Sequence, residues 1–347
     1  MIKYVQGNIV EADAEVLVNT VNCMGVMGKG IALQFKQAFP DNFDAYRSCC
    51  AASELEPGKM FVFETKSIVG PKYIINFPTK RHWKGKSRLE DVDAGLNALI
   101  QEVIRLEIKS IAVPPLGCGL GGLDWSVVRP RIERAFQSLP DVRVLLFEPA
   151  GAPLPNAMPV RTKPPKMTRA RALFIMLIDQ YNAMSYRLTL LEVQKLAYFL
   201  QESGEPLKLK FVSHTYGPYA ENLDQVLQRI EGHFTRGYGD SPNPGRAIEL
   251  LTGAVEAANS FLETSDESLE RLRIVSKLIE GFETPYGMEL LASVHWVAVH
   301  QEPRARNASE AVEKVHAWND RKARIFKTDH IGIAWERLNQ SGFLTIP

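Results

Sequence analysis

A stretch crowded with prolines near the middle of the chain limits what the chain can fold into. Residues 149–167 contain six prolines and show neither helical nor strand periodicity. Because proline lacks a backbone N–H and fixes its own φ angle, no helix interior or central strand crosses such a segment. The chain has 347 residues, and one domain usually has about 100–200. We therefore expect two domains, residues 1–150 and 168–347, joined by a linker over residues 151–167.

The first 150 residues alternate short β-branched runs with amphipathic segments. The runs at residues 16–21, 73–77, 111–113 and 142–147 have the composition of buried strands. Ser87-Arg-Leu-Glu90 has the form of a capping box, and apolar residues follow it at helical spacing. This alternation predicts a three-layer α/β fold, with a mixed or largely parallel sheet between helices.

The second half has helical patterns throughout, so we expect an all-helical domain there. Thr189-Leu-Leu-Glu192 is a further capping box, followed by apolar residues on one helical face. Other helical patterns cover about residues 219–234, 267–280, 287–300 and 331–340.

Two glycine-rich loops follow predicted strands of the first domain. One contains Gly25, Gly28 and Gly30, and the other runs from Gly117 to Gly122. Glycine permits positive φ and lets backbone N–H groups approach a ligand closely, although such glycines can also serve only a tight turn. Neither loop has Walker A or dinucleotide-fold spacing. Two of them at strand ends of one domain favour a ligand with a diphosphate.

A third strand end carries basic and aromatic residues. Thr79, Lys80, His82 and Trp83 come directly after the predicted strand at 73–77. They could form a solvated basic corner. Beside a diphosphate site, however, Lys80 is a candidate nucleophile or electrostatic catalyst, and His82 is a weaker candidate acid or base.

Composition excludes several classes of protein. The 41 basic and 40 acidic residues give a net charge of +1, which argues against a protein that is basic over its whole surface. The four cysteines do not have the number or spacing of a disulfide framework or zinc ribbon. No apolar run reaches the ~18 residues of a membrane span, and the first residues lack a signal sequence. We expect a cytoplasmic protein without a metal, a cofactor or a membrane partner.

The first 150 residues resemble a macrodomain, the α/β/α module that binds ADP-ribose. Gly7-Asn-Ile-Val10 and the run Ala14–Asn22 resemble its opening, and Gly117–Gly122 resembles its second phosphate loop. Gly28-Lys-Gly-Ile-Ala32 together with Phe77-Pro-Thr-Lys80 resembles one branch, the DarG family of DNA ADP-ribosyl glycohydrolase antitoxins.

This resemblance implies a role for each residue that matches the family pattern. Lys80 would act at the anomeric carbon of ADP-ribose. The family norm at position 8 is Asp, and the related branch has an Asp partner for the lysine where this chain has Gly121; Asp124 lies three residues on. The other implied contacts are to the adenine edge (Asn8, Ile9), the distal ribose (Thr20, Val21, Asn22), a helix N-terminus and apolar wall (Gly30, Ile31, Leu33, Gln34), the anomeric carbon (Thr79) and the phosphates (Gly117, Cys118, Gly119, Leu120, Gly121).

The second half also contains two distinctive segments, Leu191–Gln201 and Phe211–Ala220. Their Gln194-Lys195 and Tyr216-Gly-Pro218 sequences are similar to the Panacea type of antitoxin domain, which binds a toxin. Together the two resemblances imply an enzyme that removes ADP-ribose from thymidine in single-stranded DNA, releasing ADP-ribose, and that captures a DarT-like ADP-ribosyltransferase toxin. Two alternatives remain open: a reader that binds ADP-ribose without cleavage, and a hydrolase of ADP-ribosyl-glutamate or O-acetyl-ADP-ribose.

Overall fold

The computed structural model describes residues 1–149, 158–182, 188–239 and 247–344. These residues form two compact units. The first runs from Met1 to Lys163, and the second contains nearly all described residues from Pro164 onward. Part of the expected linker, residues 150–157, lies outside the described residues. Arg161 belongs to the first unit, where its backbone N–H donates to the Gln37 carbonyl (2.8 Å).

The first unit is built on a six-stranded mixed sheet with the strand order β1-β6-β5-β2-β4-β3. All neighbouring strands are parallel except the edge strand β3, which is antiparallel to β4. The strands are β1 (Ile2–Val5), β2 (Val16–Asn22), β3 (Phe61–Glu64), β4 (Tyr73–Lys80), β5 (Ser110–Val113) and β6 (Arg143–Phe147). The four strands expected from the sequence are confirmed, and the short edge strands β1 and β3 were not predicted.

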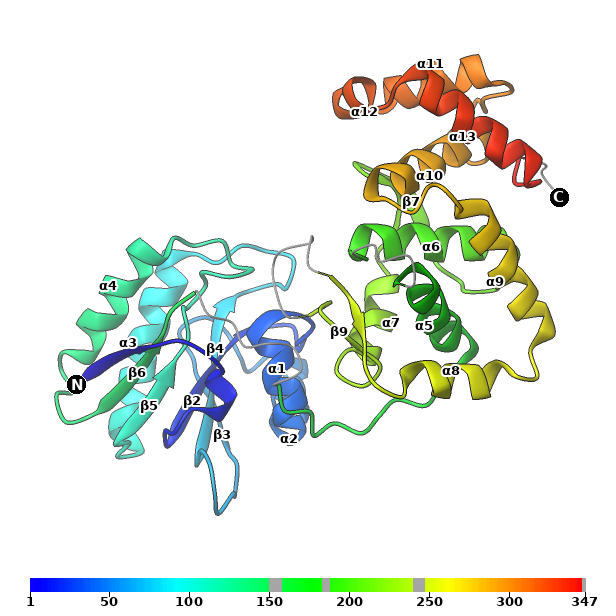
Figure 1. The fold of residues 1–347 in the computed structure, drawn as a ribbon. Helices are drawn as coiled ribbons and strands as arrows, with labels where there is room; N and C mark the ends of the chain where they lie inside the picture. The colour runs from blue at the N-terminus through cyan, green and yellow to red at the C-terminus, as the bar shows by residue number, and fades with distance from the viewer. Residues whose placement is uncertain (150–157, 183–187, 240–246, 345–347) are drawn as a thin grey trace. The chain divides into compact units, whose positions relative to one another are not determined.

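Helices cover both faces of this sheet (Figure 1). They are η1 (Ile9–Glu11), α1 (Gly30–Ala38), α2 (Pro40–Ala51), α3 (Leu89–Arg105) and α4 (Trp125–Phe136). Side chains alternate along β2, since Val16 and Val18 pack into the core that holds α3 and α4, while Leu17 packs with Phe35 of α1. A sheet with both faces buried requires apolar residues at successive strand positions, which explains the continuous hydrophobic runs of the sequence. The predicted three-layer fold is confirmed.

One predicted capping box is absent and the other is present. Arg88 occupies the N-cap of α3 without a side-chain hydrogen bond, so the box expected at Ser87 is wrong. The Ser87 N–H donates instead to the Gly121 carbonyl (3.0 Å), which turns the residue away from the helix. At α6 (Leu190–Glu202), the box forms as predicted: the Leu191 N–H donates to the Thr189 hydroxyl (3.3 Å), and the Thr189 N–H donates to the Glu192 carboxylate (2.8 Å).

The second unit is predominantly helical, in agreement with the prediction of a helical domain, but it is not all-helical, because it also holds two small antiparallel sheets. The sheets pair β7 (Phe211–His214) with β8 (Gly217–Ala220), and β9 (Thr235–Arg236) with β10 (Glu249–Leu250). The helices besides α6 are α5 (Arg169–Asn182), α7 (Leu223–Ile230), α8 (Ala254–Leu262), α9 (Asp266–Ile279), α10 (Pro285–Val299), α11 (Ala308–Trp318), α12 (Asp320–Ile325) and α13 (Thr328–Gln340).

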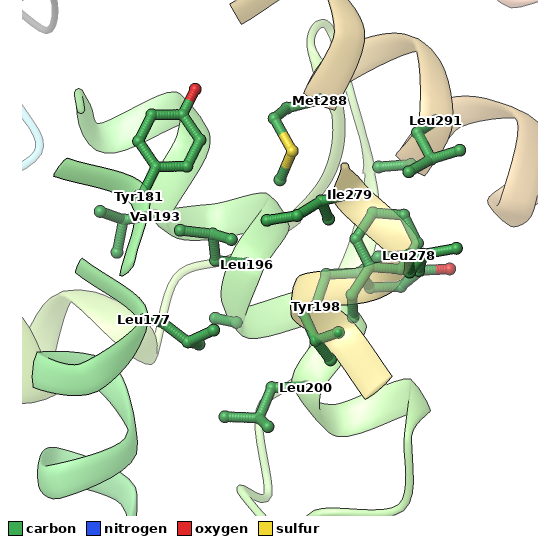
Figure 2. Packing of buried hydrophobic residues seen from close by; sticks show 14 of the residues in the cluster. Leu177, Tyr181, Val193, Leu196, Tyr198, Leu200, Leu278, Ile279, Met288 and Leu291 are labelled. Atoms are coloured by element: carbon green, nitrogen blue, oxygen red, sulfur yellow. The ribbon is translucent and has the colours of Figure 1, made fainter. Parts of the chain in front are cut away.

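One continuous core holds these helices together. Figure 2 shows Leu177 and Tyr181 of α5, Leu196 of α6, Ile279 of α9 and Met288 of α10 within it. All of these side chains are buried. Among the described residues, no helix is both long and apolar enough to span a membrane.

The two distinctive segments of the second half meet in this unit. Gln194 of α6 exchanges two hydrogen bonds with the Ala220 backbone (2.9 and 3.1 Å), and Lys195 Nζ donates to the Pro218 carbonyl (2.7 Å). Burial, followed by the charge of Lys322, lowers the pKa of Lys195 to about 7. The Gln-Lys pair therefore fixes the β7–β8 hairpin against α6.

Candidate active site

The carboxyl ends of three neighbouring strands form the candidate site. Asn22 at the end of β2 is the register partner of Lys80 at the end of β4. Lys80 Nζ donates a 2.5 Å hydrogen bond to the Leu120 carbonyl, which belongs to the loop after β5. Ligands of open α/β sheets collect at this edge, because loops there turn into helix N-termini. Parallel pairing thus brings together the three loops that the sequence marked separately.

Lys80 is half-buried, and this burial lowers the pKa of its ammonium group. Loss of water favours the uncharged form of an amine, so a larger share of Lys80 is a free amine at a given pH. Thr79 beside it is buried, and the Cys23 thiol donates to the Lys80 carbonyl (3.5 Å). Burial raises the pKa of Cys23 to about 11, so this cysteine is a thiol at neutral pH.

The second glycine loop has no room for a side chain at Gly121. A Cβ atom there would lie 2.2 Å from both the Gly117 carbonyl oxygen and the Ser87 hydroxyl oxygen. Gly117 itself has φ +72°, in the left-handed region that favours glycine. An Asp partner for Lys80 therefore cannot occupy position 121 without rebuilding the loop.

Asp124 does not replace that partner in this structure. It is the N-cap of α4, and its carboxylate accepts from the backbone N–H and the hydroxyl of Ser126 (both 2.8 Å). These bonds lower the pKa of Asp124. His82 is also engaged locally, since its Nδ1 accepts from the Lys84 backbone N–H (3.1 Å).

Ser87 is a site residue that sequence reasoning missed. It is 7% exposed, and its hydroxyl has no hydrogen-bond partner among the described residues. The side chain lies against Gly117 and Gly121, and the backbone N–H holds the Gly121 carbonyl. In the sequence, the capping-box pattern Ser87–Glu90 led to the assignment of this serine to the helix. Its place in the structure is under the phosphate loop.

Asn22 shapes the first glycine loop. Its side-chain oxygen accepts from the Met24 N–H (2.8 Å), and its Nδ2 donates to the Val26 carbonyl (2.6 Å). An amide nitrogen has two N–H donors, so one donor beyond this bond could serve a ribose hydroxyl. The buried Tyr46 hydroxyl donates to the Asn22 carbonyl (2.6 Å) and ties the loop to α2. Sequence reasoning missed Tyr46, whose spacing gave no sign of this contact.

The remaining predicted site residues differ in how far their side chains are exposed to solvent. Gly30 has φ +60° and begins α1, whose N-terminus has no side-chain cap. Leu33 and Gln34 are buried, whereas Leu120 is 46% exposed. The Val21 side chain is buried and packs with Met27 and Tyr46. Thr20 at the end of β2, Ile31 in the first turn of α1 and Cys118 of the second glycine loop are partly exposed, and Gly119 of the same loop is exposed.

Asn8 and Ile9 lie at the short helix η1. The Asn8 side-chain oxygen accepts from the Val10 N–H (3.3 Å), and its Nδ2 is buried without a partner among the described residues. A donor of this kind suits a ring nitrogen of adenine better than the exocyclic amine. Ile9 is buried and packs with α1.

A buried asparagine network supports the sheet below the site. Asn19 of β2 donates to Asn76 of β4 (2.9 Å), and Asn76 donates to Asn42 of α2 (2.7 Å). All three side chains are fully buried. Because buried amides are costly unless they are hydrogen-bonded, the network fixes α2 on the sheet.

In the second unit, Glu202, His295 and His300 place potential ligand atoms within 4.8 Å of one another. The spacing of the two histidines along the chain did not predict this, because His300 lies just beyond the end of α10. Both ring nitrogens of His295 are already engaged, by the Tyr198 hydroxyl (2.6 Å) and the Phe343 carbonyl (3.0 Å). The cluster is therefore explained by packing.

Comparison with known proteins bears on the family of the chain. The family model of the Macro domain matches residues 18–132. A DNA ADP-ribosyl glycohydrolase of Thermus aquaticus is 45% identical over 345 residues, which cover 99% of this chain and 94% of that protein. A fusion protein of Thermosipho africanus, named for a DNA ADP-ribosyl transferase and a DNA ADP-ribosyl glycohydrolase, is 35% identical over 44% of this chain and 43% of its own.

Among solved structures, the macrodomain of Mycobacterium tuberculosis DarG is 55% identical. It matches 43% of this chain and 99% of its own, with a TM-score of 0.43. The Thermus relative is matched along nearly its whole length, through both halves of the present chain. The chain therefore belongs to the DNA ADP-ribosyl glycohydrolase (DarG) family.

Proposed function

We propose that this chain hydrolyses the bond between ADP-ribose and a thymine base of single-stranded DNA, with Lys80 as the catalytic residue. Family membership supports the reaction class. The position of Lys80 supports its catalytic role, because its half-buried ammonium group lies where the carboxyl ends of β2 and β4 meet and contacts the phosphate loop. That placement is the observation on which the proposal rests.

In the proposed reaction the bond from the anomeric carbon to the base nitrogen breaks. The electron pair leaves with the base, and positive charge develops on the anomeric carbon and the ring oxygen. Water adds its oxygen to this carbon, one proton goes to the base nitrogen, and free ADP-ribose leaves. Lys80 as a cation stabilises the departing base. As a free amine it can attack the same carbon as the bond to the base breaks; water then adds to that carbon, and the bond to the lysine nitrogen breaks, which returns the amine. Its lowered pKa is compatible with both roles.

The two glycine loops would hold the rest of ADP-ribose. The Gly30 N–H at the start of α1 already donates to the Gly239 carbonyl (2.6 Å), so backbone N–H groups of the Gly117–Gly121 loop and of α1 after Gly30 suit the diphosphate. Asn22 would bond the distal ribose, and the Nδ2 of Asn8, unpartnered among the described residues, would bond adenine. No resident metal or organic cofactor takes part in this scheme.

The experiment that tests the linkage compares three substrates: ADP-ribosylated single-stranded DNA, ADP-ribosyl-glutamate peptide and O-acetyl-ADP-ribose. We expect release of ADP-ribose from the DNA to exceed the others at least 100-fold. Faster cleavage of either of the other two would contradict the proposal. ADP-ribose binding without cleavage of any substrate would make the protein a reader.

We also propose that the second unit captures a DarT-like toxin. The fusion protein of Thermosipho africanus, which joins a transferase to a glycohydrolase in one chain, supports a functional link between the two activities. The β7–β8 hairpin offers a contact surface, since Val212 is 56% and Tyr216 46% exposed. The Arg321 guanidinium lies 4.6 Å from the Tyr216 ring centroid and holds the ring in place. Exposed aromatic residues are typical anchors of protein interfaces.

Toxin capture is tested with the full chain carrying Lys80→Ala, so that hydrolysis does not mask binding. We expect this variant to elute with the toxin in size-exclusion chromatography. Adding Val212→Ser and Tyr216→Ser should weaken the complex at least ten-fold. Failure of the Lys80→Ala chain to bind the toxin would refute capture without affecting the proposed hydrolysis.

A further inference from the structure

The loop that follows the candidate catalytic lysine has an unusual composition. Residues 81–88 contain four basic side chains, one histidine and one tryptophan, and no acidic residue. All of them except Ser87 are exposed. The proposed hydrolysis uses none of these exposed side chains.

An ion pair and a backbone hydrogen bond hold this loop at its two ends. Arg81 forms a two-bond ion pair with Asp91 of α3 (2.9 and 3.3 Å), and the Asp91 side chain is nearly buried. At the other end the Ser87 N–H donates to the Gly121 carbonyl (3.0 Å). Between them, the Gly85 N–H donates to the His82 carbonyl (3.0 Å) and closes a turn. The loop therefore has a defined shape before any ligand arrives.

The turn presents an aromatic surface to solvent. The His82 and Trp83 rings stack with centroids 5.6 Å apart and an interplanar angle of 25°. Lys84 Nζ lies 4.8 Å from the centroid of the Trp83 ring. Even so, Trp83 is 43% exposed. An indole held in a fixed orientation and still open to water is a platform on which a flat ring can stack.

Charge and position identify the class of ligand. Arg81 pairs with Asp91, and the exposed Lys84, Lys86 and Arg88 lie within five residues of Trp83 in the same segment. Trp83 follows Lys80 by three residues, a span of at most about 10 Å of extended chain. A ligand that fits this segment has a flat ring and phosphates within that distance of the reacting bond. A neighbouring nucleotide of the DNA strand has both. Stacking on the indole requires an unpaired base, which excludes a closed duplex.

We propose that residues 82–88 form a binding site for single-stranded DNA, in which Trp83 stacks on a base next to the ADP-ribosylated nucleotide and Lys84 and Lys86 contact its phosphates. This inference rests on the proposed function, and it assigns the loop to the part of the substrate outside ADP-ribose.

The stacking role is tested by Trp83→Ala and Trp83→Phe in the full chain, on two substrates. One is an ADP-ribosylated single-stranded oligonucleotide, and the other is ADP-ribosyl-thymidine, which has no neighbouring base. We expect Trp83→Ala to lower kcat/KM roughly ten-fold for the oligonucleotide. For the nucleoside, kcat/KM of this variant should stay within about two-fold of the value of the unaltered chain. Trp83→Phe should recover most of the loss.

The phosphate contacts are tested by the salt dependence of binding to an unmodified single-stranded oligonucleotide. Lys84→Gln with Lys86→Gln should reduce the slope of log K against log salt concentration by about 1.4. Lys3→Gln with Lys109→Gln is the matched control, since these exposed lysines lie at the amino-terminal ends of β1 and β5, away from Lys80. The control should leave the slope unchanged.

Each outcome separates this inference from the proposed function. Equal losses on both substrates after Trp83→Ala would mean that the ring supports the active site alone, and no loss on either would mean that it contacts no DNA. Both results overturn the inference while hydrolysis by the unaltered chain stands. If the unaltered chain cleaves neither substrate, the proposed function itself fails.

Discussion

At the scale of single residues, the environment of a side chain decides its chemistry more than its type does. Lys80 and Lys195 are both lysines whose pKa burial lowers, yet their settings differ. Lys80 is half-exposed at the edge of the sheet. Lys195 is buried, and the Pro218 carbonyl accepts its hydrogen bond. The first can meet a substrate, and the second holds a hairpin.

Gly121→Asp should disable the phosphate loop. The new Cβ would lie 2.2 Å from the Gly117 carbonyl oxygen, so the loop must move. We expect at least a ten-fold loss of ADP-ribose affinity by calorimetry. Gly332→Ala is the control, because a Cβ at that position meets no atom within 4 Å and the residue lies in α13, outside the candidate site. Normal binding of ADP-ribose by the Gly121→Asp variant would contradict the rigid loop described here.

His295 should make the second unit sensitive to acid. Burial lowers the pKa of His295 to about 4, from 6.5 in the unfolded chain. Between these values the unfolded state takes up a proton first, so stability falls as the pH drops from 6.5 towards 4. Above 6.5 the group has no effect. The shift corresponds to about 3 kcal/mol. Urea unfolding of His295→Gln should show a flatter pH dependence than the unaltered chain over this window, and parallel curves would refute the prediction.

At the scale of elements, local sequence patterns predicted a helix or strand correctly where the pattern lies within one segment of the chain. The β-branched runs predicted four strands, and Thr189 predicted the start of α6. The same type of signal failed at Ser87, because a contact with Gly121, distant in sequence, determines where that residue lies. The edge strands β1 and β3 are short and have one neighbour each, so they carry no long apolar run.

The two capping-box sequences should respond differently to mutation. Thr189→Ala removes an intact box and should lower the free energy of unfolding of the second unit by about 1 kcal/mol. Ser87→Ala removes a hydroxyl that has no hydrogen-bond partner among the described residues, so the first unit should change by less than about 0.5 kcal/mol. Urea denaturation measures both. A larger effect at Ser87 than at Thr189 would contradict the cap assignments.

The candidate site, like the helices and strands, could be predicted from the sequence only in part. The glycine loops and Lys80 could be found in the sequence because each lies directly after a strand, and parallel strands bring their ends together. The contacts of Tyr46 with Asn22 and of Ser87 with Gly121 join segments that no local pattern connects. The roles of individual site residues towards ADP-ribose stay predictions.

At the scale of the whole molecule, the chain consists of two compact units with separate cores. A net charge of +1 over 347 residues does not exclude a nucleic-acid substrate, because the basic residues of 81–88 are concentrated beside Lys80. We propose that the first unit performs the chemistry and the second binds the protein partner.

Independent units should unfold separately. ADP-ribose at about 1,000 times its Kd should stabilise the first unit by about 4 kcal/mol and leave the second unit unchanged. Differential scanning calorimetry of the full chain should then show one transition that moves upward and one that stays. A single transition that shifts as a whole would mean that the units unfold together.

The most direct test of the central claim is single-turnover release of ADP-ribose from ADP-ribosylated single-stranded DNA by Lys80→Ala, with Lys109→Ala as the matched control. The account predicts a rate at least 100-fold below that of the unaltered chain, with ADP-ribose Kd within three-fold and the control unchanged. Release by Lys80→Ala at the normal rate would contradict the assignment of catalysis to Lys80.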